Sequence, residues 1–228
     1  MSIYTIGDLH LSFHSPKPMD IFGEKWEDHE AKIKNNWINT VKKDDLVVLL
    51  GDFSWATYLQ DTYQDFEYLS KLPGKKLLLK GNHDYWWTTV TKMRNFLKEN
   101  NFENIDFVYN TAYKFENCII AGTRGWALTN KPEDEKFIKR EADRLELSIK
   151  EALKLRTNEE IIVFIHYPPI NKEINPFITT MQKYNIKRCY YAHLHGDSIK
   201  EAIEGNYFGI DFKLVSADSL NFKLLKID

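Results

Sequence analysis

Residues 46–52 read Leu-Val-Val-Leu-Leu-Gly-Asp, an apolar run that ends in a glycine and a carboxylate. Residues 3–7 form a similar run that leads into Asp8, and residues 76–80 lead into Gly81-Asn82. Continuous apolar runs are typical of strands that are buried on both faces of a parallel sheet. The carboxyl ends of such strands meet at one edge, where ligands bind. These segments therefore predict a parallel sheet that carries polar side chains along one edge.

The rest of the chain alternates between helix and strand signals. Amphipathic spacing predicts helices at residues 26–42, 58–71, 87–100, 132–155 and about 177–184. Further strands are predicted at 107–110, 113–115, 118–122, 161–165 and 188–191. The tail is predicted to form a meander of short strands at 207–210, 212–216 and 222–227. We expect an α/β fold in layers, with a sheet on each side of the core and helices outside.

The composition is that of an ordinary globular protein, at 43% hydrophobic and 28% charged residues. A length of 228 residues predicts a single domain over residues 1–228. The 31 basic and 33 acidic residues leave a net charge of −2, which gives nucleic acid binding no support. No apolar run is long enough to span a membrane, and no secretory leader is recognisable. With two cysteines, both expected to be reduced and buried, we expect a cytoplasmic protein without membrane partners.

Five of the seven histidines lie at predicted strand ends: His10, His83, His166, His193 and His195. Residues two apart in an extended segment point to the same side, so paired residues of this spacing can hold one cation. Asp8 and His10 have this spacing, as do His193 and His195. Each motif also has an ordinary alternative, which is a helix or turn cap for the carboxylates and a buried, hydrogen-bonded imidazole for His166.

Together these motifs contain carboxylate, amide and imidazole donors. That donor set suits Mn²⁺, Fe, Zn²⁺ or Ni²⁺. A carboxylate such as Asp52 can bridge two ions, because each of its oxygens can bind a different one. Two-metal sites clamp the attacking and leaving oxygens of an in-line displacement and generate hydroxide near neutral pH.

Five blocks occur in order between residues 3 and 195, and they resemble the signature of the calcineurin-like metallophosphoesterases. These blocks are Gly7-Asp8-x-His10, Gly51-Asp52, Gly81-Asn82-His83-Asp84, His166 and His193-x-His195. The resemblance implies a four-layered αββα sandwich, with two mixed β-sheets flanked by helices. The sequence differs from the family pattern at Ala192, where the family usually has glycine. It also differs at residues 53–55, where Phe-Ser-Trp replaces the acidic residue found in many relatives. The additional arginine motifs of the protein phosphatases are not found, which weakens a phosphoprotein substrate.

The resemblance also implies residue roles. Asp8, His10 and His195 would bind one ion. Asn82, His166 and His193 would bind the second, and Asp52 would bridge the two. His83, oriented by Asp84, would donate to a phosphoryl oxygen or protonate the leaving group.

The expected function is therefore that of a phosphoesterase with two divalent or trivalent metal ions. A hydroxide that bridges the ions would attack a phosphodiester or a small phosphomonoester, including nucleotide-like esters. The alternative is an inactive or weakly active member of the family that binds other proteins. The complete set of ligands, together with His83, favours an enzyme. The oligomeric state stays open.

Several residues outside these blocks could contact the substrate. Arg124, at another predicted strand end, could hold a phosphate in its guanidinium fork, or it could be a surface residue stacked on Trp126. Aromatic residues near the ligands could stack on a nucleobase or an aryl leaving group, or pack in the core. They are Trp55, Tyr85, Trp86, Trp87 and Trp126.

Overall fold

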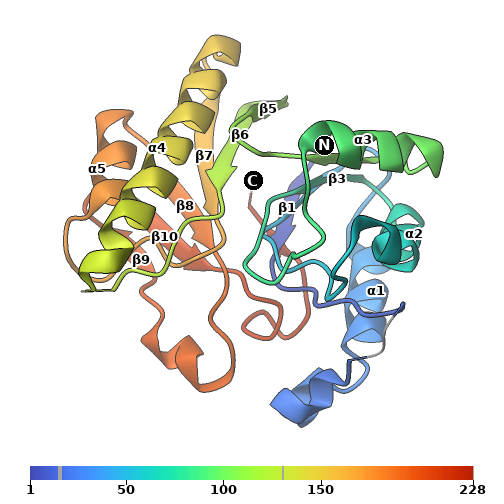
Figure 1. Ribbon diagram of the computed structural model, residues 1–228. Helices are drawn as coiled ribbons and strands as arrows, with labels where there is room; N and C mark the ends of the chain where they lie inside the picture. The colour runs from blue at the N-terminus through green and yellow to red at the C-terminus, as the bar shows by residue number, and fades with distance from the viewer. Residues whose placement is uncertain (15–16, 130, 228) are drawn as a thin grey trace.

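Two β-sheets pack face to face, and helices cover the outer face of each (Figure 1). The computed structural model describes residues 1–14, 17–129 and 131–227. In Figure 1 the first sheet lies to the right with helices α1, α2 and α3, and the second lies to the left with α4 and α5. This arrangement confirms the predicted αββα sandwich with two mixed sheets.

The first sheet is built from βαβ units. Within the described residues its strand order is β11-β1-β2-β3-β4, and all neighbours are parallel except β11 against β1. In the part of the chain that the structure describes, one α-helix lies between each consecutive pair of strands from β1 to β4. The strands are β1 (Ile3–Ile6), β2 (Leu46–Leu49), β3 (Lys75–Leu78), β4 (Ile105–Phe107) and β11 (Leu225–Lys226), and the helices are α1 (His29–Thr40), α2 (Tyr63–Ser70) and α3 (Val90–Glu99).

The second sheet has a parallel centre and antiparallel edges. Its order is β5-β6-β7-β8-β10-β9, where β6, β7, β8 and β10 are parallel and the two outer strands are antiparallel to their neighbours. Helices α4 and α5 cover its outer face. The elements are β5 (Ala112–Phe115), β6 (Cys118–Thr123), β7 (Glu160–Ile165), β8 (Arg188–Tyr191), β9 (Gly205–Tyr207), β10 (Ile210–Leu214), α4 (Pro132–Leu155) and α5 (Pro176–Lys183).

The alternation of side chains along each strand separates the layers. In β2, Leu46 and Val48 face the second sheet, while Val47 and Leu49 face the helices of the first. Successive side chains of a strand point to opposite faces, so a wholly apolar strand contributes to two cores. This explains why the early strands are apolar at every position.

Helix boundaries follow local capping. Helix α3 begins at Val90 rather than at residue 87, because the Thr89 side chain accepts a hydrogen bond from the Lys92 amide. Helix α5 begins at Pro176, where the Asn175 side chain accepts from the next two amides. Helix α4 spans the predicted range, with proline in its first turn. The predicted starts at 26 and 58 instead lie in or next to short 3₁₀ turns, Glu24–Trp26 and Leu59–Thr62, that precede α1 and α2.

The predicted terminal meander is wrong. Strands β9 and β10 form a hairpin at the edge of the second sheet, and residues 207–210 include its turn. The chain then crosses to the first sheet, where β11 pairs with β1. Gly7 anchors this crossing, because its amide donates to the Val215 carbonyl and its carbonyl accepts from the Ala217 amide. The strand expected at 107–110 is also displaced, to β4.

Candidate functional site

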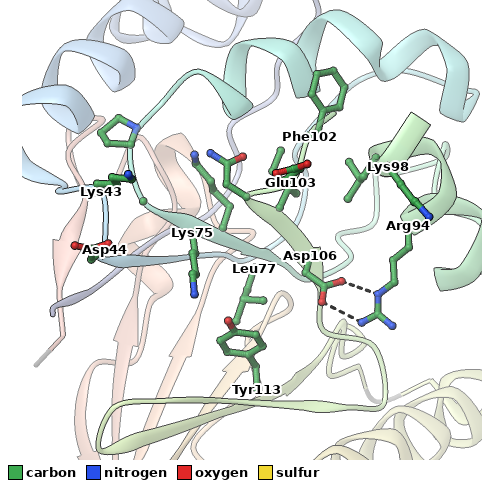
Figure 2. A pocket seen from close by; sticks show the side chains of 16 residues that line it. Lys43, Asp44, Lys75, Leu77, Arg94, Lys98, Phe102, Glu103, Asp106 and Tyr113 are labelled. Carbon is green, nitrogen blue, oxygen red and sulfur yellow. Dashed lines mark hydrogen bonds and ion pairs between the residues drawn. The ribbon is translucent and has the colours of Figure 1, made fainter. Parts of the chain in front are cut away.

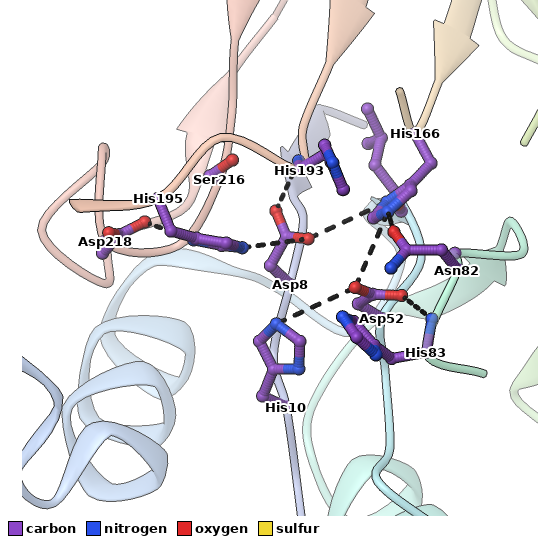
Figure 3. Close-up of polar contacts among 12 residues, drawn as sticks. Asp8, His10, Asp52, Asn82, His83, His166, His193, His195, Ser216 and Asp218 are labelled. Carbon is purple, nitrogen blue, oxygen red and sulfur yellow. Dashed lines mark hydrogen bonds and ion pairs between the residues drawn. The ribbon is translucent and has the colours of Figure 1, made fainter. Parts of the chain in front are cut away.

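All seven predicted metal ligands lie together at the carboxyl ends of the strands (Figure 3). The first sheet contributes Asp8 and His10 after β1, Asp52 after β2 and Asn82 after β3. The second contributes His166 after β7, with His193 and His195 after β8. The edge predicted from the apolar runs is therefore the edge at which these side chains meet.

The donor atoms form two groups, and each group draws on both sheets. Asp8, His10 and His195 form the first group, and Asp52, His166 and His193 form the second. Within each group the candidate ligand atoms lie within 4.8 Å of one another. This is the partition that the family resemblance implied, with Asn82 placed beside the second group.

Asp52 lies between the two groups. Its Oδ2 atom is 3.9 Å from His10 Nε2 and 3.6 Å from His166 Nε2. Its other oxygen, Oδ1, accepts a hydrogen bond of 2.8 Å from the His83 amide, which holds the carboxylate in place (Figure 3).

The hydrogen bonds of two histidines, His166 and His195, direct the second ring nitrogen of each into the site. The Nδ1 atom of His166 lies 2.7 Å from the Leu50 carbonyl and therefore donates to it, so the neutral ring presents the lone pair of Nε2. That nitrogen is 2.7 Å from Asn82 Oδ1, which is also an acceptor. In His195, Nδ1 lies 2.8 Å from Asp218 Oδ1, and Nε2 lies 3.5 Å from Asp8 Oδ1. Converging acceptors of this kind suit a cation.

Several buried polar atoms at the site lack hydrogen-bond partners among the described residues. They are Asp8 Oδ1, His10 Nδ1, His83 Nδ1 and His195 Nε2. Buried polar atoms are normally satisfied, so a cluster of exceptions needs an explanation. A metal ion held by Asp8 Oδ1 and His195 Nε2 would supply it for these two atoms, so the residues present fit the ions that the family resemblance implies.

The pKa values also reflect a shortage of positive charge. Burial, and after it the charge of Asp8, raise the pKa of Asp52 to about 8. Burial lowers the pKa of His195, but Asp8 and Asp218 outweigh it and bring the pKa to about 10. The pKa of Asp8 is lowered: burial opposes this, but nearby histidines, His195 foremost, outweigh it. The buried carboxylates of Asp8 and Asp218 thus keep the His195 imidazole protonated. A bound cation would supply this positive charge in place of the proton.

Four of the candidate ligands have left-handed backbone conformations. Asp8, His10, Asp52 and His193 have φ values of 59°, 47°, 48° and 76°. Such conformations cost about 1–3 kcal/mol for residues other than glycine and cluster at functional sites. The turn after β2 is also packed closely against the turn after β3. A Cβ atom on Gly51 would lie only 2.4 Å from the Gly81 amide nitrogen, so there is no room for a side chain at residue 51.

The structure contradicts the expectation that Asp84 orients the His83 ring. Asp84 is fully buried, and its carboxylate accepts hydrogen bonds from the amides of Asp52, Phe53 and Gly81 and from Trp86 Nε1. The Nδ1 atom of His83 has no partner among the described residues. A carboxylate that accepts this many donors has no free oxygen for the imidazole. Asp84 therefore fastens the loop after β2 to the loop after β3.

His83 lies at the mouth of the site. Burial lowers its pKa, with His166 and Lys17 contributing in the same direction. Its ring lies 4.6 Å from the Trp55 ring and 5.9 Å from the His10 ring. It belongs to neither group of candidate ligands.

Sequence reasoning missed Asp218. This buried residue accepts from His195 Nδ1 and, at 2.9 Å, from the Gly196 amide. It lies shortly after β10, so the rule that found the other residues, a polar side chain after a predicted strand, applies to it as well. The signal is hidden because the tail has the pattern of a meander rather than that of a strand in the parallel sheet.

Replacing Asp218 with asparagine should weaken metal binding without abolishing it. A carboxylate behind a ligating histidine fixes its tautomer and its direction, and its loss typically costs about 10–100-fold in metal affinity or activity. Titration with Mn²⁺ followed by calorimetry would measure the change. Asp44→Asn, at an exposed position far from the site, is the matched control. Unchanged affinity in Asp218→Asn would contradict a positioning role.

Arg124 and Trp126 do not reach the cavity beside the ligand groups. Arg124 lies 3.5 Å from the buried Glu141 carboxylate, and its guanidinium carbon lies 5.0 Å from the Trp126 ring. Trp126 stacks on Phe137 of α4 and donates to Asp134. Of the other aromatic residues considered, Trp86 and Trp87 are buried in the core and Tyr85 is exposed, whereas Trp55 lines the cavity.

A wider hollow of about 780 Å³ lies at the opposite edge of the first sheet, near the amino end of β3 (Figure 2). Its walls carry both signs of charge, and Arg94 is paired with Asp106 across it. None of the candidate ligands lines it. Five residues of the predicted site, His10, Asp52, His83, His193 and His195, line the smaller cavity at the carboxyl ends instead.

Comparison with known proteins agrees with this geometry. The family model of calcineurin-like phosphoesterases matches residues 1–197, a range that contains every candidate ligand. The chain belongs to this family. The family implies divalent metal ions, and the two groups of candidate ligands are where such ions would bind. No helix within the described residues is long and apolar enough to cross a membrane.

A curated relative matches part of this phosphoesterase. The Gene 66 protein of Mycobacterium phage L5 is 32% identical over 77 residues, which make up 34% of this chain. The matched region spans 37% of the length of that protein.

Solved structures share the fold across nearly the whole chain. TT1561 of Thermus thermophilus matches with a TM-score of 0.59 and 15% identity, over 99% of this chain and 97% of its own. The phosphopantetheinyl hydrolase PptH of Mycobacterium tuberculosis matches with a TM-score of 0.53 and 14% identity, over 99% and 95%. AQ665 of Aquifex aeolicus, a protein of unknown function, matches with a TM-score of 0.51 and 20% identity, also over 99% and 95%. At these identities the likeness is one of fold.

Proposed function

We propose that this phosphoesterase binds two metal ions and hydrolyses a phosphodiester or a small phosphomonoester. The observation that carries the proposal is the position of Asp52, whose Oδ2 atom lies within 4 Å of a histidine from each group. A carboxylate so placed can bind to both ions. Asp8, His10 and His195 would hold the first ion, and Asn82, His166 and His193 the second.

The protein contributes position and charge to the reaction. When bound, the two ions supply Lewis-acid stabilisation of the phosphoryl group and activation of water. The strained turns and the hydrogen bonds of Asp84, Asp218 and the Leu50 carbonyl fix the direction of the donors before substrate arrives.

His83 is proposed to act on the leaving oxygen. The amide of this residue is tied to Asp52, so the ring is held beside the site rather than within a ligand group. A neutral imidazole donates one N–H hydrogen bond, and transfer of a proton requires the protonated ring. The negative charge of an approaching phosphoryl group favours that form, opposing the effect of burial on the pKa.

The cavity favours small substrates. Its volume is about 210 Å³, below the roughly 300–1,000 Å³ of pockets that enclose a drug-sized ligand. A larger ester, such as a nucleotide, would extend beyond it to the surface. We also propose that residues 1–228 form one domain and act in the cytoplasm, where buried thiols such as Cys189 stay reduced.

The test is a substrate panel run on protein from which metal has been removed and then restored. Mn²⁺, Fe²⁺, Zn²⁺ and Ni²⁺ are added separately, and the panel contains monoesters, diesters, nucleotides, a phosphopantetheinyl ester and short DNA. We expect about two ions per chain and hydrolysis of small esters. Ion binding without hydrolysis of any ester would favour the protein-binding alternative, and absence of ion binding would overturn the proposal.

A further inference from the structure

The cavity beside the candidate ligands has two chemically different walls. One wall consists of the polar residues His10, Asp52, His83, His193 and His195, with Gly196. The other is apolar or aromatic and comprises Met19, Phe22, Trp26 and Trp55. Hydrolysis of the phosphoryl group alone needs only the polar wall, so the apolar wall calls for a separate explanation.

The apolar wall is built from fixed rings. Trp26 is buried, and its ring lies edge-on to His10, His195 and Phe222 at 5.9, 5.6 and 5.0 Å. Trp55 stacks on His10 at 4.7 Å, and its Nε1 donates to Met19 Sδ at 3.2 Å. These contacts hold the two indole rings against the polar wall before a substrate binds. Lys17 Nζ lies 3.2 Å from the centre of the Trp55 ring and covers one of its faces, so Met19, Phe22 and Trp26 supply most of the apolar surface.

Phe22 closes the wall at the surface. It lies at the end of the 3₁₀ turn Met19–Phe22 and is 56% exposed although it lines the cavity. Its neighbour Ile21 is 67% exposed and does not line the cavity. Phe22 is therefore both part of the cavity lining and open to solvent, so a ligand in the cavity can cover it.

The position of His83 indicates which part of the substrate contacts the apolar wall. Its ring lies 4.6 Å from the Trp55 ring, and in the proposed function it acts on the leaving oxygen. The group attached to that oxygen therefore lies beside Trp55. We propose that the leaving group is a compact apolar alcohol or phenol, of about the size of a phenyl ring, seated against Met19, Phe22, Trp26 and Trp55.

This inference rests on the proposed function. The reaction is an ordinary hydrolysis of a phosphoric ester. Water forms the new bond to phosphorus, the bond from phosphorus to the leaving oxygen breaks, and that oxygen receives a proton. The products are a phosphate, or a phosphomonoester if the substrate is a diester, and an apolar alcohol or phenol. No other reactant is required.

The first experiment compares Phe22→Ser with Ile21→Ser on two esters of the same class, one with a phenyl and one with a glyceryl leaving group. Taking each variant relative to the wild type cancels the intrinsic reactivity of the esters. Phe22→Ser should lose about 5–20-fold in kcat/KM on the phenyl ester, and at least about five times more than on the glyceryl ester. Ile21→Ser should change neither value by more than about twofold.

A second experiment measures binding without turnover. Benzylphosphonate, in which a methylene group replaces the bridging oxygen, and methylphosphonate are titrated into the metal-loaded protein by calorimetry. Phe22→Ser should weaken binding of benzylphosphonate about fivefold or more and leave methylphosphonate nearly unchanged.

If Phe22→Ser lost the same fraction of kcat/KM on the phenyl and glyceryl esters, or lost none, the inference would be overturned while the proposed function stayed intact. Tighter binding of methylphosphonate than of benzylphosphonate by the wild type would do the same. Failure of the wild type to hydrolyse any ester with any of the four metals would overturn both.

Discussion

Replacing Asp52 with asparagine should lower kcat/KM by at least about 10³-fold, the largest loss we expect from a single substitution. The amide keeps the size of the side chain but removes its negative charge and replaces one carboxylate oxygen with an NH2 group, which cannot bind a cation. Because Asp52 Oδ2 lies near His10 and His166 alike, both ions should be held less tightly. Elemental analysis of the purified variant, together with rates on the best ester of the panel, measures both effects.

The control for Asp52→Asn is Asp44→Asn, which makes the same chemical change at an exposed position. It should retain the metal content and the rate of the wild type. Retention of one ion at full occupancy in Asp52→Asn would show that this carboxylate serves a single ion, and would contradict the bridging role.

The second large effect is expected at His83. His83→Asn should keep both ions and lose about 10²–10⁴-fold in rate on alkyl esters, the usual cost of removing a general acid. On p-nitrophenyl esters the loss should be much smaller, because p-nitrophenolate leaves without protonation. The measurement is the hydrolysis rate for a series of esters whose leaving groups have increasing pKa. The rate should fall more steeply with leaving-group pKa in His83→Asn than in the wild type.

His14→Asn is the matched control, because His14 lines a small hollow together with Trp55 but is half exposed beside Asp61. It should leave both the rate and its dependence on the leaving group unchanged. Loss of an ion from His83→Asn would make His83 a ligand, and full activity on alkyl esters would exclude it from the mechanism.

The strand ends were predictable because the same sequence features specify the fold and place the ligands. A wholly apolar strand such as residues 46–50 is buried on both faces, and the residue after it must lie at the sheet edge. The positions of Asp8, Asp52 and His166 follow from that rule once the strands are recognised. Local capping then decided helix starts such as those of α3 and α5, which differ from the predictions by a few residues, whereas α4 begins where it was predicted.

The contacts made by carboxylates across the fold were not predictable in this way. Asp84 follows His83 in sequence, which suggested that the two interact, but its carboxylate turns toward amides of the loop after β2. Asp218 reaches His195 only because the chain crosses from one sheet to the other after β10. Both contacts depend on where distant segments pass one another, and periodicity within a segment carries no information about that.

The aromatic residues illustrate the same limit. Trp55, Trp86 and Trp87 all lie close in sequence to candidate ligands, yet only Trp55 among these three lines the cavity. Trp86 and Trp87 enter the core between the first sheet and its helices. Trp26 and Phe22, which complete the apolar wall, come from a segment in which no ligand motif occurs.

Each group of candidate ligands takes residues from both sheets, so an ion in either group would act as a cross-link between the two halves of the sandwich. Elsewhere the sheets meet largely through apolar side chains such as Val48, Ile120 and Phe164. Saturation of one site at 100 times its dissociation constant stabilises the folded state by about 2.7 kcal/mol. The supply of metal in the cell would then govern how long each molecule survives proteolysis, as well as whether it is active.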